Sequence, residues 1–171
     1  KIPLILRPIT RRRNHFSRLR AHHCPRTLAA PRPVPLPRMN PSTIAAIATS
    51  PGMGAVALVR LSGPEAPAIA ARVFRGRPEA RREARRQHLG EIVAPDGEVV
   101  DEVLLTVFPA PGSFTGENVV EIACHGGVLV TRRVLEVLLA AGAEPAGPGE
   151  FSERAFLNGK MDLTRAEAIM D

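Results

Sequence analysis

The chain has 171 residues, of which 44% are hydrophobic and 4% aromatic, and its formal net charge is +6 at pH 7. This length is sufficient for one domain with a hydrophobic core. The absence of Trp and Tyr argues against nucleic-acid binding by base stacking, and no apolar run approaches the ~20 residues of a membrane span.

The positive charge is concentrated at the beginning of the chain. Residues 1–38 contain ten Lys and Arg and no acid, whereas residues 39–171 contain 13 basic and 17 acidic residues, which gives this part a formal charge of −4. A nucleic-acid argument from charge therefore applies only to residues 1–38. Their Arg- and Pro-rich composition without apolar periodicity predicts a disordered extension. We consider three interpretations: non-native translation upstream of an initiator at Met39, an organelle transit peptide, or a basic RNA-binding arm.

From Ser42 onward the pattern is that of a folded domain. Residues 43–49 and 56–61 predict two strands, separated by a turn at 51–54. Pro64 favours the start of a helix. The helical spacing of apolar residues then covers Ala66, Ile69, Ala70, Val73 and Phe74. The Arg- and Glu-rich residues 75–87 predict a loop or a solvated helix.

The second half predicts strands, then helices. Strands are expected at 89–93 and 99–108, joined by a hairpin turn at Pro95-Asp-Gly97, and again at 118–124. Gly126-Gly127 opens a helix that ends at Gly142, with an apolar face formed by Val130, Val134, Leu135, Val137, Leu138 and Ala141.

The chain then predicts a loop at 145–149, a short helix at 151–157, and a last helix with Asp162 as its N-cap. That helix is still running at Asp171, so we expect the natural protein to continue. The order of elements predicts an α+β domain with a mixed β-sheet and packed helices, followed by the start of an α-helical domain.

Several familiar active-site patterns fail on their structural context. Gly52-Met-Gly-Ala-Val-Ala57 matches a dinucleotide fingerprint, but a strand follows where the fingerprint requires a helix. Gly159-Lys160 resembles the end of a P-loop, but Arg154 and Met161 occupy the positions that require Gly and Ser or Thr. Cys124 and His125 are neighbours on a strand and point to opposite faces, so they cannot act as a nucleophile and its base. The distant Cys24 and Cys124 predict neither a metal site nor a disulfide, which fits a reducing compartment.

Three charged residues stand out as candidate site residues. Arg60 and Glu121 each interrupt an apolar strand, and a charge among apolar neighbours requires a partner or a polar ligand. One interpretation is a structural ion pair between them. The other is a ligand such as a pterin, whose adjacent N–H donors a carboxylate can accept. Lys160 follows a Gly turn that can present it, and Gly126-Gly127 could either bind an anion or allow close packing.

Residues 39–171 resemble the N-terminal region of the MnmE (TrmE) family of tRNA modification GTPases, with the motifs in the same order. The longest of these motifs, Pro148 to Leu163, is highly specific. The other matching segments are Thr43–Thr49, Pro51-Gly52, Val59–Pro64, Ser113–Asn118, Glu121 with Cys124–Gly127, and Ala166–Ala168.

The resemblance implies a fold like the folate-binding domain of one-carbon enzymes. It divides the chain into the extension 1–38, a folate-binding and dimerisation domain at 39–158, and the start of a truncated central helical domain at 159–171. The bound cofactor would be 5-formyl- or 5,10-methylene-tetrahydrofolate, and the family's folate contacts fall on Arg60, Glu121 and Lys160. No catalytic residue is implied within the chain, because GTP, Mg²⁺ and K⁺ belong to a G domain outside it.

The resemblance also implies a function for the intact protein. It would be a homodimeric, cytoplasmic GTP hydrolase that works with the flavin enzyme MnmG (GidA), without a membrane, on C5 of the wobble uridine U34 of tRNA. If residues 1–38 are a transit peptide, the location would be mitochondrial. Two other functions remain open: a stand-alone folate-dependent one-carbon enzyme, and RNA binding through residues 1–38.

Overall fold

The computed structural model describes residues 42–50, 52, 54–77, 83–162, 164, 165 and 168. The expectations for residues 1–38 and Met39, for part of the turn at 51–54, for part of 75–87 and for most of the last helix lie outside the described residues. Within them the chain alternates strands and helices along the sequence. The elements are β1 (Ile44–Ile47), β2 (Val56–Ser62), α1 (Ala66–Val73), β3 (Phe74–Gly76), β4 (His88–Val93), β5 (Val99–Phe108), β6 (Val119–His125), α2 (Val128–Ala140), β7 (Glu144–Pro145) and α3 (Glu150–Leu157).

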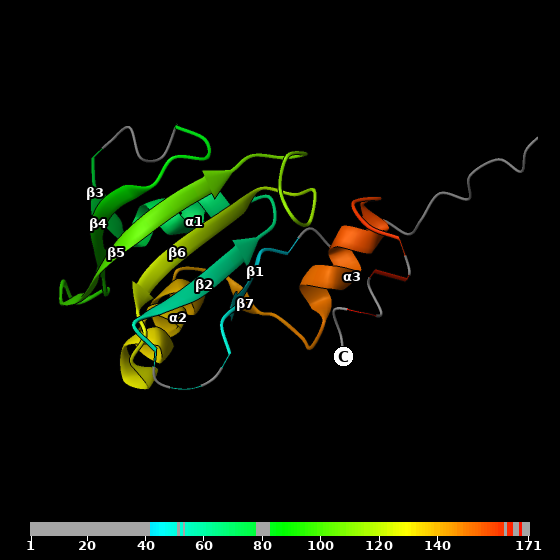
Figure 1. Ribbon diagram of the computed structural model, residues 1–171. Coiled ribbons are helices and arrows are strands. Elements are labelled where there is room, and N and C mark those ends of the chain that lie inside the picture. Colours follow the sequence, from blue (N-terminus) through cyan, green and yellow to red (C-terminus); the bar gives the residue numbers. More distant parts are fainter. Residues whose placement is uncertain are drawn as a thin grey trace, which may run out of the picture. The chain divides into compact units, whose positions relative to one another are not determined.

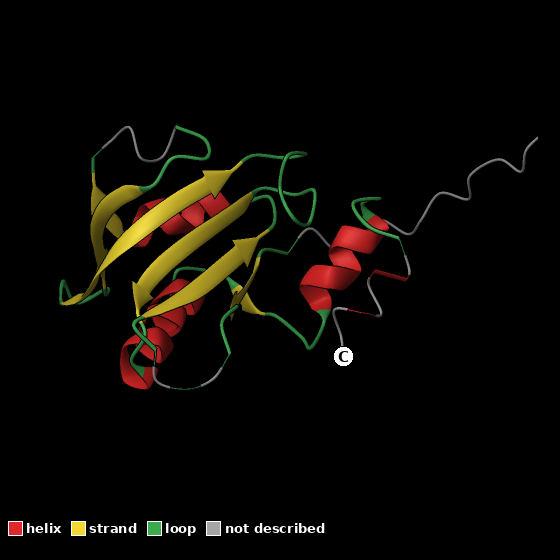
Figure 2. Ribbon diagram, viewed as in Figure 1, coloured by secondary structure: helices red, strands yellow, loops and turns green. Residues whose placement is uncertain are grey.

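The strands of the described residues form one seven-stranded sheet in the order β3-β4-β5-β6-β2-β1-β7. All neighbouring strands pair antiparallel except β1 and β7, which pair parallel and make the sheet mixed. Helices α1 and α2 lie on one face of this sheet, and the opposite face is turned toward the viewer in Figures 1 and 2. The α+β fold with a mixed sheet, predicted from the order of elements, is therefore confirmed.

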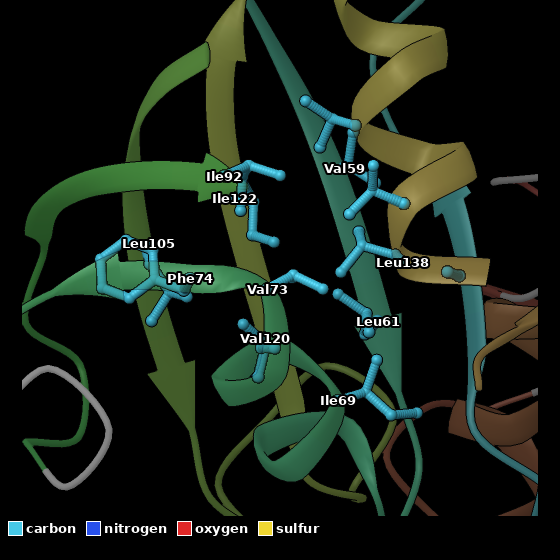
Figure 3. Close-up of a cluster of buried hydrophobic side chains, with 14 of the residues drawn as sticks. Val59, Leu61, Ile69, Val73, Phe74, Ile92, Leu105, Val120, Ile122 and Leu138 are labelled. Atoms are coloured by element: carbon cyan, nitrogen blue, oxygen red, sulfur yellow. The ribbon is translucent and has the colours of Figure 1, made fainter. Parts of the chain in front are cut away.

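The hydrophobic core lies between the sheet and helices α1 and α2. Every second residue of the central strands points into this core, and Ile69 of α1 and Leu138 of α2 meet these side chains from the helical side (Figure 3). Ile122 and Leu61 are fully buried. Burial of a side chain of this size stabilises the fold by roughly 1.5–3 kcal/mol. The strand residues between these core residues therefore point to the opposite face of the sheet, which α1 and α2 do not cover and which we call the open face.

The end of helix α1 differs from the sequence prediction. Phe74 does not continue helix α1 but begins β3, where it pairs with Ile92 and is 3% exposed. Its ring packs over Gly76 and Gly90, where an added Cβ would collide with the ring. The strand β3 also takes in Arg75 and Gly76, which we expected in a loop or helix.

A short strand replaces the start of the loop expected at 145–149. The amide N–H of Glu144 donates to the carbonyl of Thr43 at 2.8 Å, and that of Ala146 donates to the carbonyl of Ala45 at 3.0 Å. Two residues are too few to show a period in the sequence, so only the tertiary contact with β1 reveals this strand. Among the described residues, no helix is both long and apolar enough for a membrane span.

Candidate ligand-binding site

The two charged strand residues meet on the open face of the sheet. Arg60 of β2 and Glu121 of β6 are direct cross-strand neighbours. Arg60 donates from Nε at 2.9 Å and from Nη2 at 2.7 Å, both to Oε1 of Glu121. Their side chains are 22% and 24% exposed, so the pair is reachable from solvent. The second carboxylate oxygen, Oε2, accepts no hydrogen bond from the described residues and is available to a donor from outside.

Two phenylalanine rings complete the surroundings of Arg60. Its guanidinium carbon lies 5.2 Å from the ring centre of Phe114 and 5.9 Å from that of Phe151. These distances are within the range of cation–π contacts. Phe114 is itself 37% exposed. The arrangement therefore combines a carboxylate, a guanidinium and aromatic rings on one accessible surface, which suits a flat polar heterocycle.

The loop between β5 and β6 positions Phe114 through buried hydroxyl groups. Thr115 is fully buried, and its hydroxyl lies 2.6 Å from that of Ser62 at the end of β2. Ser62 also donates to Glu117 at 2.7 Å. Asn158, just after α3, donates from its side-chain amide to the carbonyl of Thr115 at 2.8 Å. The loop is thus bonded to both the sheet and the segment that follows α3.

Lys160, in the segment that follows α3, contacts the same loop between β5 and β6. Gly159 has φ of 68°, a left-handed conformation that glycine adopts without a steric penalty, and it reverses the chain after α3. The ammonium Nζ of Lys160 then donates to the carbonyl of Pro111 at 3.0 Å. Lys160 also lines a groove together with Phe114. The structure thus connects Lys160 with Arg60 through Phe114, and the role of all three charged residues as ligand contacts stays a prediction.

A buried arginine attaches α3 to the residues before β1 and to the loop between β5 and β6. Arg154 is 4% exposed and its guanidinium contacts two carboxylates, with distances of 2.8 Å to Glu150 and 3.3 Å to Glu117. It also donates to the carbonyl of Ser42 at 2.8 Å. Burial alone would raise the pKa of Glu150, but hydrogen bonds from Gly147 and Arg154 outweigh it and hold that pKa below its usual range. Arg154 therefore joins three separate segments of the chain beside the candidate site.

Gly126, the first glycine of the pair before α2, serves packing in this structure. The amide N–H of Gly126 donates to the carbonyl of Ala55 at 3.3 Å, and its carbonyl accepts from Gly54 at 3.2 Å. A Cβ on Gly126 would collide with the backbone of Gly54. Of the two interpretations, close approach of backbones therefore explains Gly126, because its N–H is already occupied. Nearby, the ring of His125 is held by Asp101, with 2.7 Å between Nδ1 and Oδ1.

Cys124 and His125 point to opposite faces, as the strand period predicts: Cys124 is 3% exposed, and the side chain of His125 is 70% exposed. Burial raises the pKa of the Cys124 thiol. We therefore expect the native chain to alkylate at Cys124 more than about tenfold slower than the urea-unfolded chain, because reaction requires both opening and ionisation. Iodoacetamide labelling followed by mass spectrometry of the peptide that contains Cys124 measures this ratio. Equal rates in the two states would contradict the burial.

The comparison with known proteins agrees with the motifs at this site. Residues 43–160 match the protein family described as GTP-binding protein TrmE N-terminus. Because the match covers more than half of the chain, the protein belongs to this family. Its individual relatives carry a more specific name.

The chain is 57% identical over 129 residues to the tRNA modification GTPase MnmE of Chloroflexus aurantiacus, and 57% identical over 128 residues to that of Thermus thermophilus. It is 56% identical over 130 residues to that of Geobacter sulfurreducens. These alignments cover 74–75% of this chain, and the chain spans 28–30% of the length of these relatives.

Proposed function

We propose that this chain is the tetrahydrofolate-binding and homodimerisation module of a larger GTPase that modifies tRNA. The tRNA-modification part of this proposal is supported by the relatives of the chain, which are named tRNA modification GTPase MnmE. The intact protein would act with the flavin enzyme MnmG on C5 of the wobble uridine U34, in the cytoplasm. The 171 residues contain no complete P-loop sequence, so we expect no GTP hydrolysis from this chain alone.

The observation that carries the folate proposal is the Arg60–Glu121 pair, whose guanidinium lies within cation–π distance of two aromatic rings. A pterin offers adjacent N–H donors on one edge, and the free Oε2 of Glu121 can accept them. Phe114 and Phe151 provide apolar surface for its flat ring system. Arg60 and Lys160 would then hold the polar and carboxylate groups of the folate. The residues present thus fit the cofactor, which would supply a one-carbon unit when bound.

Calorimetric titration of the 171-residue chain with 5-formyltetrahydrofolate tests this proposal. We expect saturable binding with one folate per chain, and sedimentation analysis of the same sample should give twice the monomer mass. Titration with p-aminobenzoate alone serves as a control, because that compound lacks the pterin that Glu121 would bind. A folded, dimeric chain that shows no heat with 5-formyltetrahydrofolate would contradict folate binding by this module.

A further inference from the structure

The groove beside the candidate site has a composition of its own. It has a volume of about 510 Å³. The described residues that line it are Ser113, Phe114, Lys160, Met161, Arg165 and Ala168. Phe114 belongs to this wall and also contacts the guanidinium of Arg60 at 5.2 Å. A ligand that starts at the Arg60–Glu121 pair can therefore continue into the groove along this ring.

The polar part of the groove carries positive charge. Its described lining includes two cations, Lys160 and Arg165, and no acid. The ammonium of Lys160 uses one donor on the carbonyl of Pro111 at 3.0 Å, and an ammonium has three donors, so two are left. Arg165 uses its backbone N–H on Asp162 at 2.8 Å, and its guanidinium makes no hydrogen bond or ion pair with the described residues. Two cations with spare donors favour a ligand that has more than one anionic group.

Apart from Ser113, the remaining wall is apolar. Phe114, Met161 and Ala168 offer an aromatic, a flexible thioether and a methyl surface. A ligand that fits the whole groove therefore has an apolar body followed by more than one anionic group. A tetrahydrofolate has an aminobenzoyl ring followed by one or several glutamates, and each further glutamate adds one carboxylate.

We propose that this groove selects polyglutamylated tetrahydrofolates, with Lys160 on the first glutamate and Arg165 on a carboxylate of the next. This inference rests on the proposed folate function and goes beyond it, because it assigns Arg165 and names the form of the cofactor. The contact with Arg165 is exposed to solvent, so its contribution is modest and depends on salt.

Titration of the 171-residue chain with the monoglutamate and the triglutamate of 5-formyltetrahydrofolate tests the assignment. We expect the triglutamate to bind about fivefold more tightly than the monoglutamate at low salt, which is the upper range for one exposed charge pair. The substitution Arg165→Gln should reduce this ratio to near one, and Arg165→Lys should retain part of it. The ratio of the wild-type chain should also fall as salt is raised.

Arg132→Gln is the matched control, because Arg132 is an exposed arginine on helix α2 and does not line the groove. This variant should keep the wild-type ratio. Equal affinity of the wild-type chain for both forms, or an unchanged ratio in Arg165→Gln, would overturn the inference and leave the folate proposal standing. Failure of both forms to bind would overturn the two together. Displacement of the triglutamate by an oligoribonucleotide, lost in Arg165→Gln, would assign the groove to RNA phosphates and refute the folate tail.

Discussion

Replacement of Arg154 by Met is expected to lower the free energy of unfolding by roughly 3 kcal/mol, because it leaves two partly buried carboxylates, which are 26% and 21% exposed, without their common partner. Arg154 is 4% exposed and contacts the carboxylates of Glu117 and Glu150 as well as the carbonyl of Ser42. Met keeps much of the apolar volume of the arginine stem and removes the donors. Urea unfolding followed by circular dichroism measures the difference.

The matched control is Arg75→Met. Arg75 also binds one glutamate, Glu91, at 2.6 Å, but its side chain is 61% exposed. An exposed pair contributes about 0–1 kcal/mol, so this variant should unfold almost as the wild type does. A loss in Arg154→Met no larger than that in Arg75→Met would refute the structural role of Arg154.

Acid provides a second check on the same network. The pKa of Glu150 is held below its usual range, so its pairing stabilises the fold above the ordinary glutamate pKa of about 4.3. That contribution disappears as the pH falls through the lowered pKa, because the carboxyl then becomes protonated in the folded state as well. The stability difference between wild type and Arg154→Met should therefore shrink in strong acid. A difference that is constant from neutral pH into that range would exclude a contribution from Glu150.

Local patterns predicted those parts of the fold that depend on neighbours in sequence. The hairpin between β4 and β5 follows from a turn sequence at Pro95-Asp-Gly97 between two apolar runs, and it lies where expected. Asp162 accepts the N–H of Arg165 at 2.8 Å, as an N-cap should. The pairing of Arg60 with Glu121 was one of two interpretations, and the period of a strand made it visible because each charge interrupts an apolar run.

Contacts between distant segments could not be predicted in this way. Phe114 comes from a loop and Phe151 from α3, and only the tertiary fold brings both to Arg60. The sequence offered only one indication that these two residues matter, which is that phenylalanine is scarce: the chain contains only six. The helical spacing could predict Glu150, four residues earlier, as a partner of Arg154. It could not predict Glu117, which lies 37 residues away in the sequence. Arg154 is buried in the fold, but the sequence alone shows what looks like an ordinary arginine on a helix surface.

Replacement of Glu121 by Gln is expected to weaken the binding of 5-formyltetrahydrofolate about thirtyfold, provided that the proposed folate function holds. The amide has the size of the carboxylate but only one acceptor oxygen, so it cannot receive both the two donors of Arg60 and the N–H groups of a pterin. A hydrogen bond to a charged group contributes about 1.5–3 kcal/mol, and 1.4 kcal/mol corresponds to a factor of ten in affinity. Calorimetric titration of the variant measures the change.

The two interpretations of the Arg60–Glu121 pair give different results in this variant. If the pair only stabilises the sheet, Glu121→Gln lowers the midpoint of urea unfolding and leaves folate affinity unchanged. If the pair binds the ligand, the folate affinity falls although the variant is fully folded, because the titration is made without urea. Glu91→Gln is the control. It also removes a carboxylate that pairs with an arginine across two strands, here Arg75 of the edge strand β3. Loss of folate binding in that control as well would show that charge removal from the sheet, rather than the position of Glu121, causes the effect.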